Sequence, residues 1–223
     1  MGTTTTLTAE DGHRLAAYRA APTGAPRGGL VVIQEIFGVN SHIKSVCDGY
    51  AADGYLALAP SLFDRVERDV AMGYGPSDIE RGRTLRGKVG WEQMVADLRA
   101  AVRALQAEKL KVGAVGYCMG GSLAWLAATR VDGLAAAVGY YGGAVADFAQ
   151  EQPRCPVLLH FGESDSSIPK EHWDRIAAAH PKVPMHLYPA GHGFNCDARA
   201  SYHEPSARLA RQRTLEFLRK YVG

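Results

Sequence analysis

The stretch that most constrains the fold of this chain runs from Val112 to Ala128 and reads VGAVGYCMGGSLAWLAA. Its first half is short, apolar and rich in glycine, which is typical of a buried parallel strand. From Met119 onward, the apolar residues have the spacing of a helix that packs against a sheet. A strand that passes directly into a helix predicts an α/β fold, and it raises the question of why Cys118 lies at the turn.

Similar apolar segments alternate with amphipathic ones along the rest of the chain. Two short strands around Asp11-Gly12 are predicted to form an N-terminal hairpin, whereas residues 61–90 are polar and irregular. This order predicts a mostly parallel central sheet with helices on both faces. With 47% hydrophobic content, the chain is predicted to form a single domain, 1–223. We expect further strands over 29–35, 55–59, 134–140, 157–161 and 185–188, and further helices over 43–52, 91–108, 170–179 and 206–221.

The turn itself, Gly116-Tyr117-Cys118-Met119-Gly120, matches the G-x-S-x-G pattern with sulfur in place of oxygen. In that pattern the nucleophile lies on a sharp strand-to-helix turn, and the backbone N–H of the next residue, here Met119, points toward a developing oxyanion. The helix N-terminus also favours a thiolate. Cys118 is therefore a candidate nucleophile, although the motif alone is equally compatible with a buried cysteine that only fills space.

Three further reactive side chains follow expected strands. Glu35 ends one strand, Asp165 follows another, and His192 follows the last. Because ligands in parallel sheets bind beyond the carboxyl ends of the strands, these side chains are expected to converge near Cys118. A thiol needs a base, and the base needs a partner that orients it, so His192 and Asp165 complete a candidate catalytic triad. The order of nucleophile, acid and histidine along the chain is that of α/β-hydrolases.

Two other acidic residues, Glu163 and Asp174, compete with Asp165 for the orienting role. Asp165 is favoured because it follows the strand directly and precedes Ile168-Pro169, which should start the next helix. The alternatives are that Asp165 is a turn or N-cap residue and that His192 is an ordinary loop histidine. The glycines on both sides of His192 favour the catalytic interpretation.

The chain resembles the dienelactone hydrolases (carboxymethylenebutenolidases) of the α/β-hydrolase superfamily, from the N-terminal hairpin to the final helix. The resemblance implies an α/β-hydrolase fold, the triad of Cys118, His192 and Asp165, and an oxyanion hole formed by the backbone N–H groups of Ile36 and Met119. It also implies that Glu35 supports catalysis by contacting the thiol in the resting enzyme. The motifs that carry the resemblance are Gln34-Glu35-Ile36-Phe37-Gly38-Val39-Asn40, Gly116-Tyr117-Cys118-Met119-Gly120-Gly121, Gly162-Glu163-Ser164-Asp165 with Ile168-Pro169, and Gly191-His192-Gly193-Phe194.

The family pattern also predicts how a substrate is held. Dienelactone-specific members of the family bind the substrate carboxylate with two arginines. The first would be Arg81, with Arg83 close behind it, in the irregular segment. The second should lie four residues after the histidine, where this chain has Cys196, and Arg199 lies at a different spacing. This difference predicts that dienelactone is a poor substrate relative to an uncharged lactone or ester.

The sequence therefore predicts a hydrolase that cleaves an ester or lactone through a cysteinyl acyl-enzyme, without a metal or an organic cofactor. One alternative is a general carboxylesterase or thioesterase unrelated to dienelactone. Another is a non-catalytic relative that binds a small ligand or senses oxidants through Cys118. Since Cys118, Asp165 and His192 are all present, the catalytic interpretation is favoured over the second alternative.

Composition limits the partners and the location that we expect. The 25 basic and 23 acidic residues are interspersed, so no basic stripe indicates binding to nucleic acid. No apolar run approaches the roughly 18 residues of a membrane span, and no signal peptide is visible. The four cysteines lack the spacing of a metal site, so we expect free thiols in the cytoplasm. The expected partner is a small-molecule substrate, and the expected state is a monomer or weak homo-oligomer.

Overall fold

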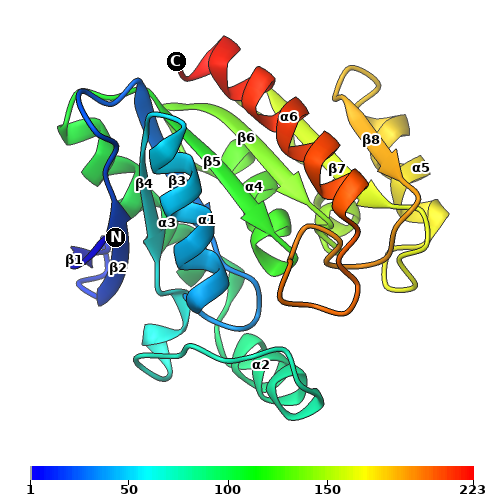
Figure 1. Cartoon of the computed structure of the whole chain (residues 1–223), viewed down its shortest axis with the longest axis horizontal. Helices are drawn as coiled ribbons and strands as arrows, with labels where there is room; N and C mark the ends of the chain where they lie inside the picture. Colours follow the sequence, from blue (N-terminus) through cyan, green and yellow to red (C-terminus); the bar gives the residue numbers. More distant parts are fainter. Residues whose placement is uncertain (1) are drawn as a thin grey trace.

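Eight strands form one sheet within residues 2–223, the part of the chain that the computed structural model describes (Figure 1). Their spatial order is β1-β2-β4-β3-β5-β6-β7-β8. β1 and β2 form the predicted antiparallel hairpin, β2 pairs with β4 in antiparallel fashion, and all further pairs are parallel. The prediction of a mostly parallel sheet is confirmed. The strands are β1 (Thr3–Thr8), β2 (Arg14–Ala20), β3 (Gly28–Ile33), β4 (Tyr55–Pro60), β5 (Val112–Tyr117), β6 (Leu134–Tyr140), β7 (Val157–Gly162) and β8 (Met185–Tyr188).

Helices cover both faces of this sheet, as the alternation of elements predicts. They are α1 (Ser41–Ala52), α2 (Pro76–Lys88), α3 (Trp91–Ala107), α4 (Met119–Arg130), α5 (Lys170–Ala179) and α6 (Glu204–Tyr221). In Figure 1, α1 and α6 lie in front of the sheet, and α3 and α4 lie behind it. Helix α3 packs against the sheet through one apolar face. The residues of this face, which recur at helical spacing and are at most 1% exposed, are Met94, Leu98, Val102 and Leu105. Within residues 2–223, no helix combines the length and the apolar character that crossing a membrane requires.

The segment between β4 and α3 contains a helix that the sequence does not predict. We expect an irregular stretch over 61–90, whereas the structure has a 3-10 turn, Leu62–Arg65, followed by α2. Pro76 at the start of α2 supplies a helical φ angle, and Asp78 accepts a hydrogen bond from the Gly75 N–H at 3.1 Å. Only two positions of α2 are buried, so its sequence carries no apolar periodicity that would reveal a helix.

The loop after β3 is tied to its neighbours by side-chain amides. Gln34 Oε1 accepts a hydrogen bond from the Leu62 N–H at 3.1 Å, and Asn40 Nδ2 donates to the Met72 carbonyl at 2.9 Å. Asn40 is also the N-cap of α1, because its Oδ1 accepts a hydrogen bond from the Ile43 N–H at 3.1 Å. These bonds fix the loop at the carboxyl edge of the parallel strands, where the candidate site lies.

Candidate active site

Cys118 lies between β5 and α4 in a backbone conformation that few side chains adopt. Its φ of 55° and ψ of −116° belong to a region that glycine occupies far more easily. The glycines on either side let the turn close. A Cβ on Gly116 would lie 1.8 Å from the Gly120 carbonyl oxygen, and one on Gly120 would lie 2.3 Å from the Ile33 carbonyl oxygen. The strand-to-helix turn therefore presents the Cys118 side chain at the edge of the sheet.

The structure brings the three predicted triad residues together. His192 Nε2 lies 3.2 Å from Cys118 Sγ, and His192 Nδ1 lies 2.7 Å from Asp165 Oδ2. Burial opposes a charge on the imidazole, but the Cys118 sulfur and the Asp165 carboxylate outweigh it and raise the pKa of His192 to about 10. The arrangement can accept a proton from the thiol and hold it on a ring that is oriented from the other side.

Asp165 and His192 are positioned by the turns that follow β7 and β8. Asp165 is buried, and its second oxygen, Oδ1, accepts a hydrogen bond from the Ser167 N–H at 2.9 Å. The Asp165 carboxylate therefore contacts both the turn and the histidine. The sequence had offered these contacts as alternatives, a turn residue or the partner that orients His192. Gly193, directly after His192, has a φ of +78°, and a Cβ there would lie 2.5 Å from Arg199 Nη1. Glycine is required at this position by both the turn and the neighbouring guanidinium.

Glu35 is buried, at 1% exposure, and two side chains hold its carboxylate. Arg199 Nη1 donates to Oε1 at 3.1 Å, and the Tyr74 hydroxyl donates to Oε2 at 3.1 Å. Burial opposes the charge of Arg199, but Glu35 outweighs this effect and raises the pKa of the guanidinium. The carboxylate is thus neutralised by Arg199, and the Cys118 sulfur has His192 as its hydrogen-bond partner. The contact between Glu35 and the thiol that the resemblance implies stays a prediction.

The two backbone N–H groups expected in the oxyanion hole are Ile36, after β3, and Met119, the first residue of α4. Within residues 2–223, neither N–H donates a hydrogen bond to another protein group. Helix α2 packs directly against Ile36, since a Cβ on Gly82 would lie 2.5 Å from the Ile36 carbonyl oxygen. The close approach of α2 to this loop thus depends on a glycine.

The structure does not place the predicted substrate-binding residue, Arg81, at the triad. Its side chain lies on the outer face of α2, is 52% exposed, and forms an ion pair with Glu67. Cys196, which stands where the family pattern has an arginine, is fully buried. The cation near the carboxylate is instead Arg199, which approaches from an irregular segment seven residues after His192. Arg81 therefore contacts Glu67 rather than a triad residue, and its role in holding a substrate stays a prediction.

Sequence reasoning missed the contribution of two tyrosines. Tyr74 reaches Glu35 from the segment before α2. Tyr141, after β6, packs against His192 with ring centroids 5.1 Å apart, and its backbone φ is 39°. The available signal was the Tyr140-Tyr141-Gly142-Gly143 run at the end of an apolar strand, where aromatic residues can line a site.

Comparisons with known proteins agree with this geometry. The model of the dienelactone hydrolase family matches residues 15–222. The chain belongs to the dienelactone hydrolase family. The carboxymethylenebutenolidase of Pseudomonas putida is 36% identical over 224 residues, covering 93% of this chain and 92% of that protein. A Salmonella typhimurium protein provisionally named carboxymethylenebutenolidase is 38% identical over 239 residues, covering 95% of this chain and 85% of that protein.

A solved structure shares the architecture of this dienelactone hydrolase family member. It comes from Klebsiella pneumoniae, is assigned provisionally as a dienelactone hydrolase, and matches with a TM-score of 0.86 and 32% identity. The match covers 99% of this chain and 100% of that one. The predicted α/β-hydrolase fold and the predicted class of enzyme, a dienelactone hydrolase-like hydrolase, are therefore confirmed. An enzyme of this family acts on a small molecule.

Proposed function

We propose that this hydrolase cleaves esters or lactones through a covalent acyl-enzyme on Cys118. The observation that carries the proposal is the continuous contact from the Cys118 sulfur through His192 to Asp165, at 3.2 Å and 2.7 Å. A nucleophile, a base and an orienting carboxylate in this order are what acyl transfer requires. A binding-only relative would have no use for the full chain of contacts.

The reaction follows from the geometry of these groups. His192 takes the proton of the Cys118 thiol, and the resulting thiolate attacks the carbonyl carbon of the substrate. The negative charge that develops on the carbonyl oxygen is stabilised by the N–H groups of Ile36 and Met119. The alcohol leaves with the proton from His192, or stays attached to the acyl group when the substrate is a lactone. Water, activated by His192, then hydrolyses the thioester and restores the thiol.

We propose that Arg199 influences which substrates are accepted. It lies beside Glu35 and lines an open groove of about 480 Å³ together with Tyr74, Ile79 and Ser201. Because Glu35 already neutralises the guanidinium, a substrate carboxylate would have to compete with a buried ion pair. Uncharged lactones and esters are therefore expected to be better substrates than dienelactone, which carries a carboxylate.

Activity assays on the nucleophile variant test this proposal. We expect Cys118→Ala to lower kcat/KM for uncharged esters and lactones by at least about 10³-fold, since the triad acts as a unit. Mass spectrometry of the wild type, quenched during turnover, should detect an acyl group on Cys118. The matched control is Cys155→Ser, which changes a thiol elsewhere in the chain and should keep full activity. Near-normal turnover by Cys118→Ala would show that another group is the nucleophile.

Three expectations about the setting of this reaction stay predictions. The chain is expected to act in the cytoplasm as a monomer or weak homo-oligomer, without nucleic acid or membrane as a partner. Fractionation of cells and light scattering of the purified protein would check the first two. The proposed hydrolysis uses the three triad side chains, two backbone N–H groups and water.

A further inference from the structure

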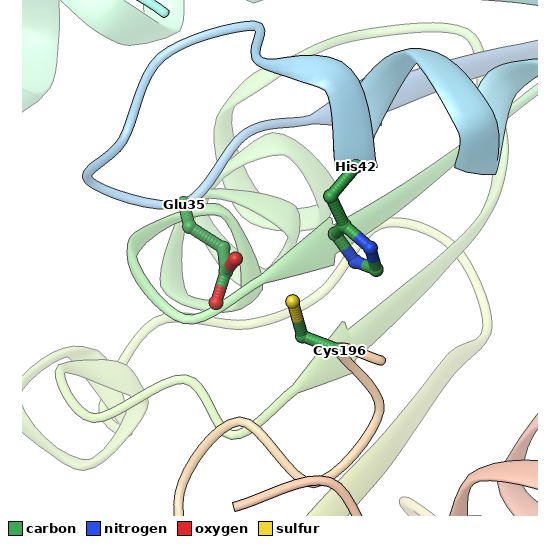
Figure 2. A group of neighbouring side chains, drawn as sticks. All are labelled: Glu35, His42 and Cys196. Carbon is green, nitrogen blue, oxygen red and sulfur yellow. The ribbon is translucent and has the colours of Figure 1, made fainter. Parts of the chain in front are cut away.

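A second group of reactive side chains lies next to the candidate active site. Glu35, His42 and Cys196 converge from the loop after β3, the start of α1 and the segment after β8 (Figure 2). One carboxylate oxygen, one ring nitrogen and the sulfur all lie within 4.8 Å of one another, and all three residues are buried. The proposed hydrolytic steps use neither His42 nor Cys196, so the cluster needs another explanation.

His42 has a free coordinating position that faces this group. Its side chain is 6% exposed, and among residues 2–223 its Nε2 has no hydrogen-bond partner. A buried polar atom without a partner has lost its hydrogen bonds to water, so a ligand bound to it would remove a cost in free energy. The other ring nitrogen, Nδ1, lies 3.1 Å from Asp197 Oδ1. When Nδ1–H donates to this carboxylate, the lone pair of Nε2 points toward the cluster.

We propose that Glu35, His42 and Cys196 bind a thiophilic divalent cation, for which Zn²⁺ is the best match. Sulfur, imidazole nitrogen and carboxylate oxygen are the three ligand types that Zn²⁺ prefers, and three protein ligands leave a fourth position for water. A carboxylate that orients a metal-binding histidine, as Asp197 does here, is a regular companion of such sites. Zinc ligands lie roughly 3.3–3.8 Å apart, so the cluster has to contract by only about 1 Å.

The charges of the site are compatible with a dication despite the presence of Arg199. Zn²⁺ is bound by the thiolate form of a cysteine, so Cys196 has to lose its proton when the cation binds. Binding breaks the S–H bond, forms an S–Zn bond and releases the proton to solvent. The Cys196 thiolate and the carboxylates of Glu35 and Asp197 then together balance the charges of Zn²⁺ and of the Arg199 guanidinium. Glu35 has about four lone-pair positions, so it can bind a cation and still accept from Arg199.

Titration with Co²⁺, followed by competition with Zn²⁺, tests the proposal, because a thiolate bound to cobalt gives a charge-transfer band in the near ultraviolet. The triad offers a competing thiol and imidazole, so the titration is made on both the wild type and Cys118→Ala. We expect one equivalent of Co²⁺ to produce the band in both proteins, and Zn²⁺ to remove it. Calorimetry in buffers of different ionisation enthalpy should find about one proton released per Zn²⁺ bound.

Variants of the cluster separate the proposed site from its alternatives. Cys196→Ser should abolish the charge-transfer band, His42→Gln should weaken binding at least tenfold, and Asp197→Ala should weaken it about 10–100-fold. Cys155→Ser is the matched control and should bind like the wild type. Circular dichroism checks that each variant is folded. If Cys196→Ser does not fold, the weaker binding expected for His42→Gln tests the site in its place. A band that disappears in Cys118→Ala and persists in Cys196→Ser, or the absence of a band in the wild type, would overturn the proposal.

Discussion

Replacing Asp165 with asparagine removes one negative charge and keeps the size and shape of the side chain almost unchanged. The carboxylate contacts His192 Nδ1 through Oδ2 at 2.7 Å and the Ser167 N–H through Oδ1 at 2.9 Å. Asparagine can keep the second contact, but it presents an N–H to His192. Nδ1 must then act as acceptor, which places the ring proton on Nε2 and leaves no lone pair for the thiol proton of Cys118. The same change removes a charge that raises the pKa of His192.

We expect Asp165→Asn to lower kcat/KM by about 10³–10⁴-fold, which corresponds to about 4–5.5 kcal/mol of transition-state stabilisation. Initial rates of hydrolysis of an uncharged p-nitrophenyl ester measure this directly, and a thermal melt checks the fold. Asp174→Asn is a matched control because that carboxylate is exposed and pairs with Lys170. A loss of less than tenfold, or an equal loss in Glu163→Gln, would refute the assignment of Asp165 as the orienting group.

Three further outcomes follow from the packing and the charges of the site. Gly82→Ala should lower kcat several-fold by pushing on the Ile36 carbonyl and so displacing this residue and its N–H, whereas Gly87→Ala, on the same helix with open space around it, should not change kcat. Cys196→Arg should lower the free energy of unfolding by at least about 1–3 kcal/mol, measured by urea denaturation, because position 196 is fully buried. The proton held by His192 stabilises the folded state fully below a pH of about 6.5, and this contribution is lost as the pH rises through about 10. The urea midpoint of the wild type should therefore fall more steeply across this window than that of His192→Asn.

The triad could be predicted from the sequence because its members follow strands directly. Parallel strands place their carboxyl ends at one edge of the sheet, so Cys118 after β5, Asp165 after β7 and His192 after β8 had to approach one another. The fold could be predicted for a related reason, since buried strands and amphipathic helices have periodicities that are visible in one dimension.

The surroundings of the triad could not be predicted in this way. Arg199 and Cys196 lie in an irregular segment, where no periodicity shows which side chain turns inward. The contacts of Glu35 with Arg199 and Tyr74 join segments that are 164 and 39 residues apart in the chain. Such pairs depend on how three loops pack together, and the charge of Arg81 alone could not show that it pairs with Glu67 on the surface.

The backbone conformation of Cys118 lowers the stability of the fold, although the proposed catalytic role of the residue depends on it. With φ at 55° and ψ at −116°, any side chain at this position stores roughly 1–3 kcal/mol of strain, most of which a glycine would release. A population of variants selected only for heat resistance would therefore gain by losing Cys118, the proposed nucleophile. Directed evolution of this protein for thermostability needs a screen for turnover in every round, because the turn offers a stabilising substitution that would end hydrolysis by the proposed mechanism.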